Sequence, residues 1–119
     1  MRTLGQERAG FALDKVMGLP HSLKKDFKPF SAGAPSTILQ NGFGQALAFW
    51  LSKNDAKHAA LFEMIKEWLV KNGFIELQAD SSVEFMKALS HTKQRQYLAA
   101  QKETLALLEW VKRYANAEL

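Results

Sequence analysis

The sequence contains no cysteine among its 119 residues. Disulfide bonds and metal sites built on thiolates are therefore excluded. Absence of cysteine is compatible with a protein of the reducing cytoplasm, where disulfides rarely persist. The three histidines, His21, His58 and His91, lie far apart in the chain, and none stands in a metal-ligand spacing such as HExxH. We therefore expect neither a metal nor another cofactor.

Long apolar runs are also missing. The longest is Ala46–Leu51, whereas a membrane-spanning helix needs roughly 20 apolar residues. The first ten residues carry Arg2, Glu7 and Arg8 without an apolar run, so they do not have the form of a secretory signal. These absences predict a cytoplasmic protein that makes no membrane contact.

Strand signals are lacking as well. No segment alternates apolar and polar residues between turn signals, and the strong helix formers Ala, Leu, Lys, Gln and Glu dominate. We therefore expect an all-α fold, a compact single-domain bundle of about six helices over residues 1–119, with no sheet. The expected helices are Thr3–Met17, Ser22–Lys28, Pro35–Lys53, Ala56–Lys71 and Ser81–Leu89, and a long last helix that begins within Ser90–Thr92 and ends near Ala117.

Proline and glycine decide two of these boundaries. Pro29 and Gly33–Pro35 are expected to end the second helix and to separate it from the third. The third is expected to continue through Gly42 and Gly44, because apolar residues keep a spacing of three and four across them. Each glycine costs a helix about 1 kcal/mol relative to alanine, which is tolerable if another backbone approaches closely there.

No recognisable catalytic motif is present. Gly42-Phe43-Gly44 lacks the third glycine of a dinucleotide fingerprint and the Lys-Ser/Thr of a phosphate-binding loop, and no strand is expected before it. The serines have no nucleophile-elbow context. We therefore expect a protein that is not an enzyme and has no small-molecule substrate.

The charge that is present is mildly basic, with a formal net charge of +4. Arg8 and Lys15 are seven residues apart and therefore share a face of the first helix. If the first two helices pack beside the last, the basic side chains form a strip that can follow a phosphate backbone. The alternative, that they are ordinary solvated lysines, stays open. The remaining members are Lys24, Lys25 and Lys28 on the second helix, and Arg95, Lys102, Lys112 and Arg113 on the last.

The last helix is apolar on more than one face. One stripe contains Tyr97, Thr104, Leu108 and Val111, and a second contains Leu107, Trp110 and Tyr114. So wide an apolar arc indicates either a helix central to its own core or one partly reserved for a partner. The tryptophans at positions 50, 68 and 110 all lie in apolar stripes, which favours core packing over stacking on bases.

Two long segments resemble a known family. Pro35–Lys53, PSTILQNGFGQALAFWLSK, is similar to the "P-x-x-I-x-x-N-G-L-x-x-x-L-A-F" helix of the small subunit of the type III-B CRISPR effector, the Cmr complex. Tyr97–Ala115, YLAAQKETLALLEWVKRYA, resembles that family's closing helix, "Y-x-x-x-x-x-E-x-L-x-x-L-x-W-x-K-R-x-A". Gln6–Val16 fits its first helix more loosely, and Phe43 stands where the family often has Leu.

The resemblance implies an all-helical, non-catalytic subunit of an antiviral ribonucleoprotein. In that family, copies stack beside the larger subunits that carry guide RNA and help to hold the guide–target duplex through basic residues. Target cleavage belongs to a larger subunit. The implied partners are other Cmr-complex subunits, guide RNA, target RNA and further copies of the same chain.

Charge clustering and the implied role together select candidate residues. The RNA-binding candidates are Lys24, Lys25, Lys28, Lys112 and Arg113, followed by Arg8, Lys15, Lys53 and Arg95. The subunit-interface candidates are Trp110, Tyr114 and Leu107.

Two alternatives accompany this hypothesis. One is a helical protein–protein scaffold module with no RNA contact of its own, and the other is a DNA-binding protein. The second is disfavoured because no basic, polar recognition helix follows a tight turn. The small subunit of type III-A effectors is a near relative in role.

Overall fold

The computed structural model describes residues 1–119 and contains six α-helices and no strand. The predicted all-α fold of about six helices is therefore confirmed. The helices are α1 (Leu4–Met17), α2 (His21–Asn41), α3 (Phe43–Lys53), α4 (Ala56–Lys71), α5 (Ser82–Ser90) and α6 (Gln94–Asn116).

Several helix ends follow from capping side chains. The Thr3 hydroxyl accepts the backbone N–H of Gln6, whose side chain accepts the N–H of Thr3, so α1 begins with a complete capping box. Asp55 and Ser81 cap α4 and α5 by accepting the backbone N–H groups of residues 58 and 84. Helix α6 begins at Gln94 with Lys93 as its N-cap, slightly later than expected, because Ser90 still belongs to α5.

The expected end of the second helix at Lys28 is wrong, because α2 continues through Pro29 and Pro35 to Asn41. A proline inside a helix removes one backbone hydrogen bond and crowds the preceding turn. Tertiary packing offsets this cost here. Four side chains at spacings of four, three and four are buried along one face of α2, namely Phe27, Ser31, Ala34 and Ile38.

The expected continuity through Gly42 is also wrong, because Gly42 separates α2 from α3. Its φ of 90° and ψ of 155° lie in a region that side chains with a Cβ rarely adopt. Gly44 does allow a close neighbour, but that neighbour is a side chain and not a backbone. The Gly44 N–H donates to the Tyr97 hydroxyl at 2.8 Å, and a Cβ at Gly44 would lie 3.2 Å from that oxygen.

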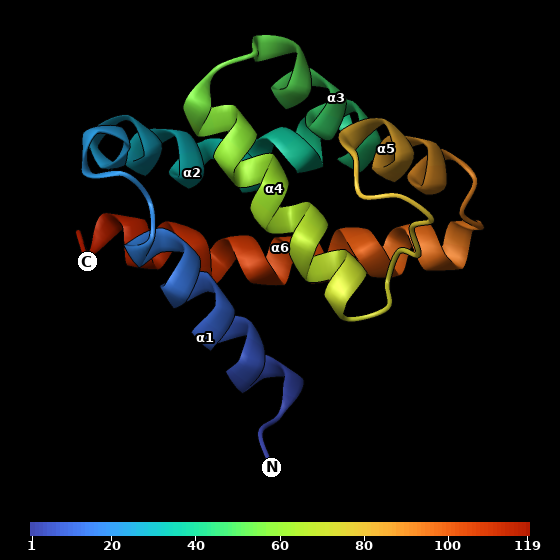
Figure 1. Cartoon of the computed structure of the whole chain (residues 1–119), viewed down its shortest axis with the longest axis horizontal. Coiled ribbons are helices and arrows are strands. Elements are labelled where there is room, and N and C mark those ends of the chain that lie inside the picture. Colours follow the sequence, from blue (N-terminus) through green and yellow to red (C-terminus); the bar gives the residue numbers. More distant parts are fainter.

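Helix α6 is the element around which α1, α2 and α4 pack (Figure 1). It runs along the molecule beside α2, while α4 crosses in front of both. Its buried residues include Ala100, Thr104, Leu107, Leu108 and Val111. This arrangement confirms that the wide apolar arc makes α6 central to its own core.

One hydrophobic cluster joins residues from all six helices. Aromatic pairs connect neighbouring elements within it. The rings of Phe11 in α1 and Trp68 in α4 have centroids 4.9 Å apart, and those of Phe62 in α4 and Phe85 in α5 are 5.7 Å apart. Trp50 and Trp68 are almost fully buried, so core packing is the role of both, whereas Trp110 is partly exposed.

Candidate nucleic-acid interface

Helices α1 and α2 both pack against α6. A joint basic surface requires this packing. Basic side chains from positions 8–28 and 95–113 are thereby carried on α6 and on two helices that pack against it. Their local environments differ, however. Some are held in ion pairs with the chain's own carboxylates, and others make no ion pair and face solvent. This difference decides which of them are available to an RNA phosphate.

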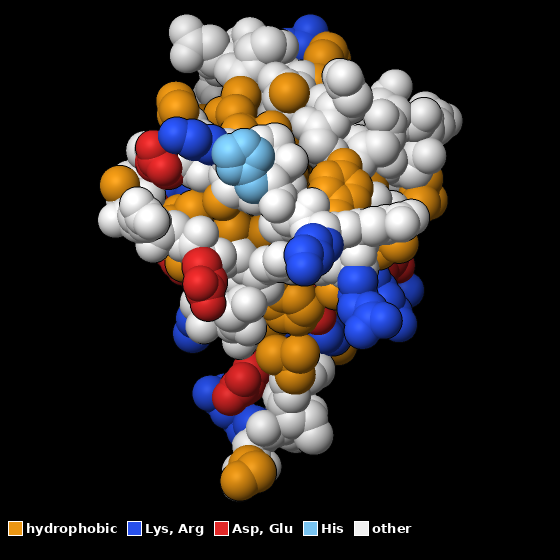
Figure 2. Space-filling view, turned by 90° about the vertical axis from the view of Figure 1, so that its right-hand side faces the viewer, with side chains coloured by type: hydrophobic (Ala, Val, Ile, Leu, Met, Phe, Trp, Pro, Cys, Tyr) orange, Lys and Arg blue, Asp and Glu red, His pale blue; other side chains and the backbone are white.

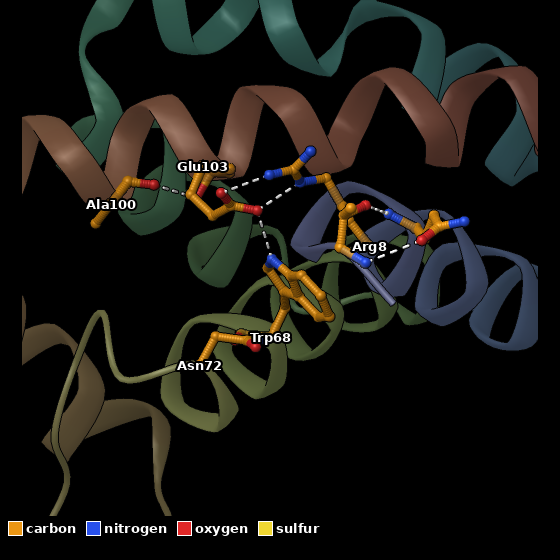
Figure 3. Close-up of polar contacts among 8 residues, drawn as sticks. Arg8, Trp68, Asn72, Ala100 and Glu103 are labelled. Atoms are coloured by element: carbon orange, nitrogen blue, oxygen red, sulfur yellow. Dashed lines mark hydrogen bonds and ion pairs between the residues drawn. The ribbon is translucent and has the colours of Figure 1, made fainter. Parts of the chain in front are cut away.

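Arg8 is held in a part-buried ion pair with Glu103 of α6 (Figure 3). The guanidinium Nε donates to Oε2 at 2.6 Å, and Nη2 donates to Oε1 at 2.8 Å. The Trp68 indole Nε1 also donates to Oε2, at 2.8 Å. The hydrogen bond from Glu103 raises the pKa of Arg8 further above its ordinary value, against the opposing effect of burial.

Glu103 therefore connects α1, α4 and α6 through a two-point contact of the kind that guanidinium and carboxylate groups form. The Arg8 side chain retains 18% of its accessible surface, and that of Glu103 retains 7%. Arg8 thus has its donors turned toward Glu103, although the charge pattern placed it among the RNA-binding candidates. The sequence did not indicate that Arg8 pairs with Glu103, because the two residues are 95 positions apart.

Lys15 and Lys112 form exposed ion pairs. Lys15 Nζ lies 2.7 Å from Glu67 of α4, and Lys112 Nζ lies 3.0 Å from Glu109 one turn earlier in α6. Such solvent-exposed pairs contribute little, about 0–1 kcal/mol, so a phosphate can replace the carboxylate at small cost. Lys53, in the last turn of α3, makes no ion pair, and its Nζ lies 4.6 Å from the centroid of the Phe49 ring.

The start of α2 and the end of α6 enclose a hollow of about 550 Å³, here called the α2 hollow. Its apolar lining comes from Val16, Leu19, Phe27 and Ala115. Its polar lining comes from His21, Lys24, Lys25, Lys28 and Glu118, and Leu119 completes it. The three predicted α2 lysines therefore lie around one concave surface.

Two of these lysines contact the last residues of the chain. Lys28 Nζ donates to Glu118 Oε1 at 2.8 Å, and Lys24 Nζ donates to the backbone oxygen of Leu119 at 3.1 Å. The hydrogen bond and charge of Lys28 lower the pKa of Glu118, so this carboxyl group is ionised at neutral pH. Lys25 makes no ion pair.

A second group of basic residues follows the exposed face of α6. Arg95, Lys102 and Arg113 are seven and eleven residues apart, so a period of 3.6 places them on one face. All three are exposed, and none forms an ion pair. This group is called the outer row. Figure 2 looks at the end of the molecule where α6 begins, and it shows Lys and Arg side chains gathered mainly on its right side.

The interface candidates separate into two classes. The rings of Trp110 and Tyr114 stack with centroids 5.7 Å apart, and Trp110 keeps 37% of its accessible surface. Leu107 is fully buried. Its side chain therefore packs inside the isolated chain and offers no surface to a partner, unlike that of Trp110.

Groups capable of other chemistry do not converge. No three His, Cys, Asp or Glu side chains come together in a geometry that can hold a metal ion. His58 is buried against Phe30 and pairs with Asp55, the N-cap of its own helix. No helix has the length and apolarity needed to cross a bilayer.

Comparisons with known proteins agree along nearly the whole chain. The family described as "CRISPR-associated protein (Cas_Cmr5)" matches residues 4–118. "CRISPR system Cmr subunit Cmr5" of Thermus thermophilus is 31% identical over 118 residues, which covers 98% of this chain and 96% of that protein. The crystal structure of a CRISPR-associated Cmr5 family protein from the same species superposes with a TM-score of 0.80 at 30% identity, covering 98% of this chain and 97% of the other. The family match covers residues 4–118, and the two predicted motifs lie on α2–α3 and α6, so this chain belongs to the Cmr5 family.

Proposed function

We propose that the chain is a non-catalytic subunit of a cytoplasmic Cmr-type ribonucleoprotein and helps to hold guide–target RNA in antiviral defence. The whole chain acts as one domain, and further copies stack beside the subunits that carry the guide. The proposal is supported by membership of the Cmr5 family and by the absence of a converging set of reactive side chains among the polar groups described above.

The observation that carries the RNA contact is the outer row of α6. Three cations lie along one solvent-facing helix surface without a carboxylate partner. Lys15 and Lys112, by contrast, each pair with a nearby carboxylate. Unpaired cations in a row supply charge and shape along a phosphate backbone, so the contact reads no bases and weakens with salt.

The α2 lysines form the second part of the proposed contact. They are carried on a helix that packs directly against α6, and Lys25 is exposed and unpaired. We place Lys53, Lys112 and Lys15 in a supporting group, because they lie outside the two clusters or already pair with carboxylates. Arg8 is left out of the contact because Glu103 occupies its guanidinium.

The test measures the affinity of the assembled complex for target RNA with three versions of this subunit. K24Q/K25Q/K28Q removes the α2 lysines, and R95Q/K102Q/R113Q removes the outer row. K57Q/K71Q/K87Q is the matched control, because it removes the same charge from α4 and α5. Each lost phosphate contact costs about 1 kcal/mol or more, which is about fivefold in affinity.

We expect both cluster variants to weaken target binding and the control to leave it near the wild-type value. Equal affinity for all three variants and the wild type would exclude an RNA contact through the α2 lysines and the outer row. An equal loss in all three would show that only net charge matters, and the assignment to the two clusters would then be wrong.

A second function, a protein–protein scaffold without RNA contact, is favoured by one observation. Trp110 is a large aromatic side chain that is left partly exposed and stacked on Tyr114. Aromatic anchors of this kind are enriched at protein interfaces. The two functions are compatible, and the scaffold function stands alone if the basic variants have no effect.

A further inference from the structure

The α2 hollow contains both a set of cations and an anion supplied by the same chain. Three lysines come from the first turns of α2, and the Glu118 carboxylate reaches one of them, Lys28, from beyond the end of α6. Neither the Glu118–Lys28 pair nor the Lys24–Leu119 contact is needed to close the core, because the residues involved are exposed or only partly buried.

The backbone at the end of α6 is bent to make these contacts. Glu118 has a φ of 59°, in the left-handed region. That position after a helix end is most often glycine, because a Cβ makes the left-handed conformation unfavourable. The turn directs Glu118 toward Lys28 and the Leu119 backbone oxygen toward Lys24. The contacts with the lysines therefore offset an unfavourable backbone conformation.

The start of α2 adds to the positive potential of the hollow. Pro20 is the N-cap and provides no side-chain hydrogen bond to the first turn. The first N–H groups of a helix have no partner within it and give this end a partial positive charge. No acidic residue lies in the first turn of α2 to balance that charge. An anion placed in the hollow is therefore stabilised by lysines and by the helix end together.

We propose that the α2 hollow binds a phosphate group of RNA and that Glu118 occupies the phosphate position when RNA is absent. This inference rests on the proposed RNA-binding function and adds a competing group to it. A lysine ammonium donates to a phosphate oxygen as readily as to a carboxylate oxygen, since both contacts are charge-assisted. Glu118 and the Leu119 backbone oxygen thus keep Lys28 and Lys24 engaged and lower their affinity for RNA until a phosphate displaces the carboxylate.

The competition predicts that removing the Glu118 charge tightens target binding. We expect E118Q to raise the affinity of the assembled complex for target RNA about two- to fivefold, the range given by loss of one exposed ion pair. E76Q is the matched control, because Glu76 makes no ion pair and lies in the connection between α4 and α5. Figure 1 shows that connection on the side of the molecule away from the last residues.

A double variant shows whether Glu118 acts through its lysine. In K28Q/E118Q the gain should fall well below that of E118Q alone, because the main cation that Glu118 covers is gone. The wild-type chain, both single variants and the double variant are first compared by thermal unfolding, so that a change in folding is recognised separately from a change in binding.

The outcomes separate this proposal from the proposed function. If E118Q binds target RNA like the wild type while K24Q/K25Q/K28Q binds it more weakly, the lysines contact RNA but Glu118 does not compete, and the inference is overturned. If no basic or acidic variant changes target affinity, the RNA-binding function fails as well. If E118Q alters recovery of the assembled complex instead of target affinity, the hollow receives an acidic surface of another subunit, and the phosphate assignment is wrong.

Discussion

At the scale of single residues, Glu103 links three helices through its side-chain hydrogen bonds. Its two oxygens accept from Arg8 of α1 and from the Trp68 indole of α4, and its backbone belongs to α6. A buried carboxylate is costly unless it is paired and hydrogen-bonded. Both conditions are met here, so loss of one partner leaves an uncompensated group in the interior.

The pair can be tested with a double-mutant cycle. We expect Glu103→Leu to lower the free energy of unfolding by about 3–5 kcal/mol, because the Arg8 guanidinium and the Trp68 N–H both lose their acceptor. The double variant R8L/E103L should cost less than the sum of its single variants, by about 1–3 kcal/mol. Urea unfolding at neutral pH measures each value.

The matched control for this cycle is Glu109→Gln, which breaks the exposed pair with Lys112. Such pairs contribute about 0–1 kcal/mol, so the control should remain close to the wild type. Additive single effects of Arg8 and Glu103 would contradict the direct coupling described here.

Asp55 gives the folded chain a defined acid sensitivity. The backbone N–H of His58, and then the His58 side chain, hydrogen-bond to this carboxylate and lower the pKa of Asp55 from 3.8 to about 2. A folded pKa below the unfolded one means that the stabilisation is complete above about pH 4. It is lost as the pH falls from about 4 to about 2.

We expect Asp55→Asn to keep a cap on α4 but to remove this titration. The urea midpoint of the variant should therefore change less between pH 4 and pH 2 than that of the wild type. Glu118, whose pKa is also lowered, titrates in both proteins. Its contribution therefore cancels when the pH dependence of the two urea midpoints is compared. Parallel profiles for the two proteins in this pH window would show that Asp55 is not the responsible group.

At the scale of helices, local signals predicted most of the helices but not the division between α2 and α3. Thr3, Asp55 and Ser81 cap helices through neighbours three residues away, so short-range chemistry was sufficient. Pro29 and Gly42 were misjudged for opposite reasons. Burial of a continuous α2 face outweighs the proline, and the backbone conformation at Gly42 interrupts an apolar spacing that looked continuous.

Gly42 and Gly33 therefore respond differently to the same substitution. A Cβ at either position meets nothing within 4 Å, so only the backbone conformation differs. We expect Gly42→Ala to destabilise the protein by about 1–3 kcal/mol, because its conformation is nearly restricted to glycine. Gly33→Ala, inside α2, should stabilise it by about 0.5–1 kcal/mol.

Urea unfolding of the two variants provides the comparison. Equal stability for G42A and G33A would mean that the chain passes from α2 to α3 without the positive φ at Gly42. The α2–α3 boundary would then have to be assigned differently.

At the scale of the whole molecule, the sequence located the basic clusters but not their partners. The spacing of seven residues predicted that Arg8 and Lys15 share a face, and the other cations were expected in clusters on the second and last helices. The pairing of Lys28 with Glu118 and of Lys15 with Glu67 depends on how helices distant in sequence pack. Periodicity contains no such information, so Arg8 and Lys25 looked alike in the sequence although one is paired and the other is free.

The exposed aromatic pair makes a separate prediction about assembly. We expect W110A/Y114A to leave the isolated chain folded but to reduce its recovery with the other subunits of the complex, since a partly exposed stack is a suitable anchor. Leu107→Ala is the contrasting variant, because loss of this buried side chain should cost the isolated chain about 2–5 kcal/mol. Normal recovery of W110A/Y114A would remove the pair from the interface.

The salt dependence of target binding distinguishes direct phosphate contact from an indirect effect of the outer row. Each phosphate that a cation neutralises contributes about 0.7–0.9 to the slope of log affinity against log salt concentration. We expect R95Q/K102Q/R113Q to reduce that slope by about 2–3 in the assembled complex, and K57Q/K71Q/K87Q to leave it unchanged. Because the contact reads no bases, two guide–target pairs of unrelated sequence should give the same reduction. A loss of affinity with an unaltered slope would mean that the outer row acts through assembly of the complex, and not through contact with the RNA backbone.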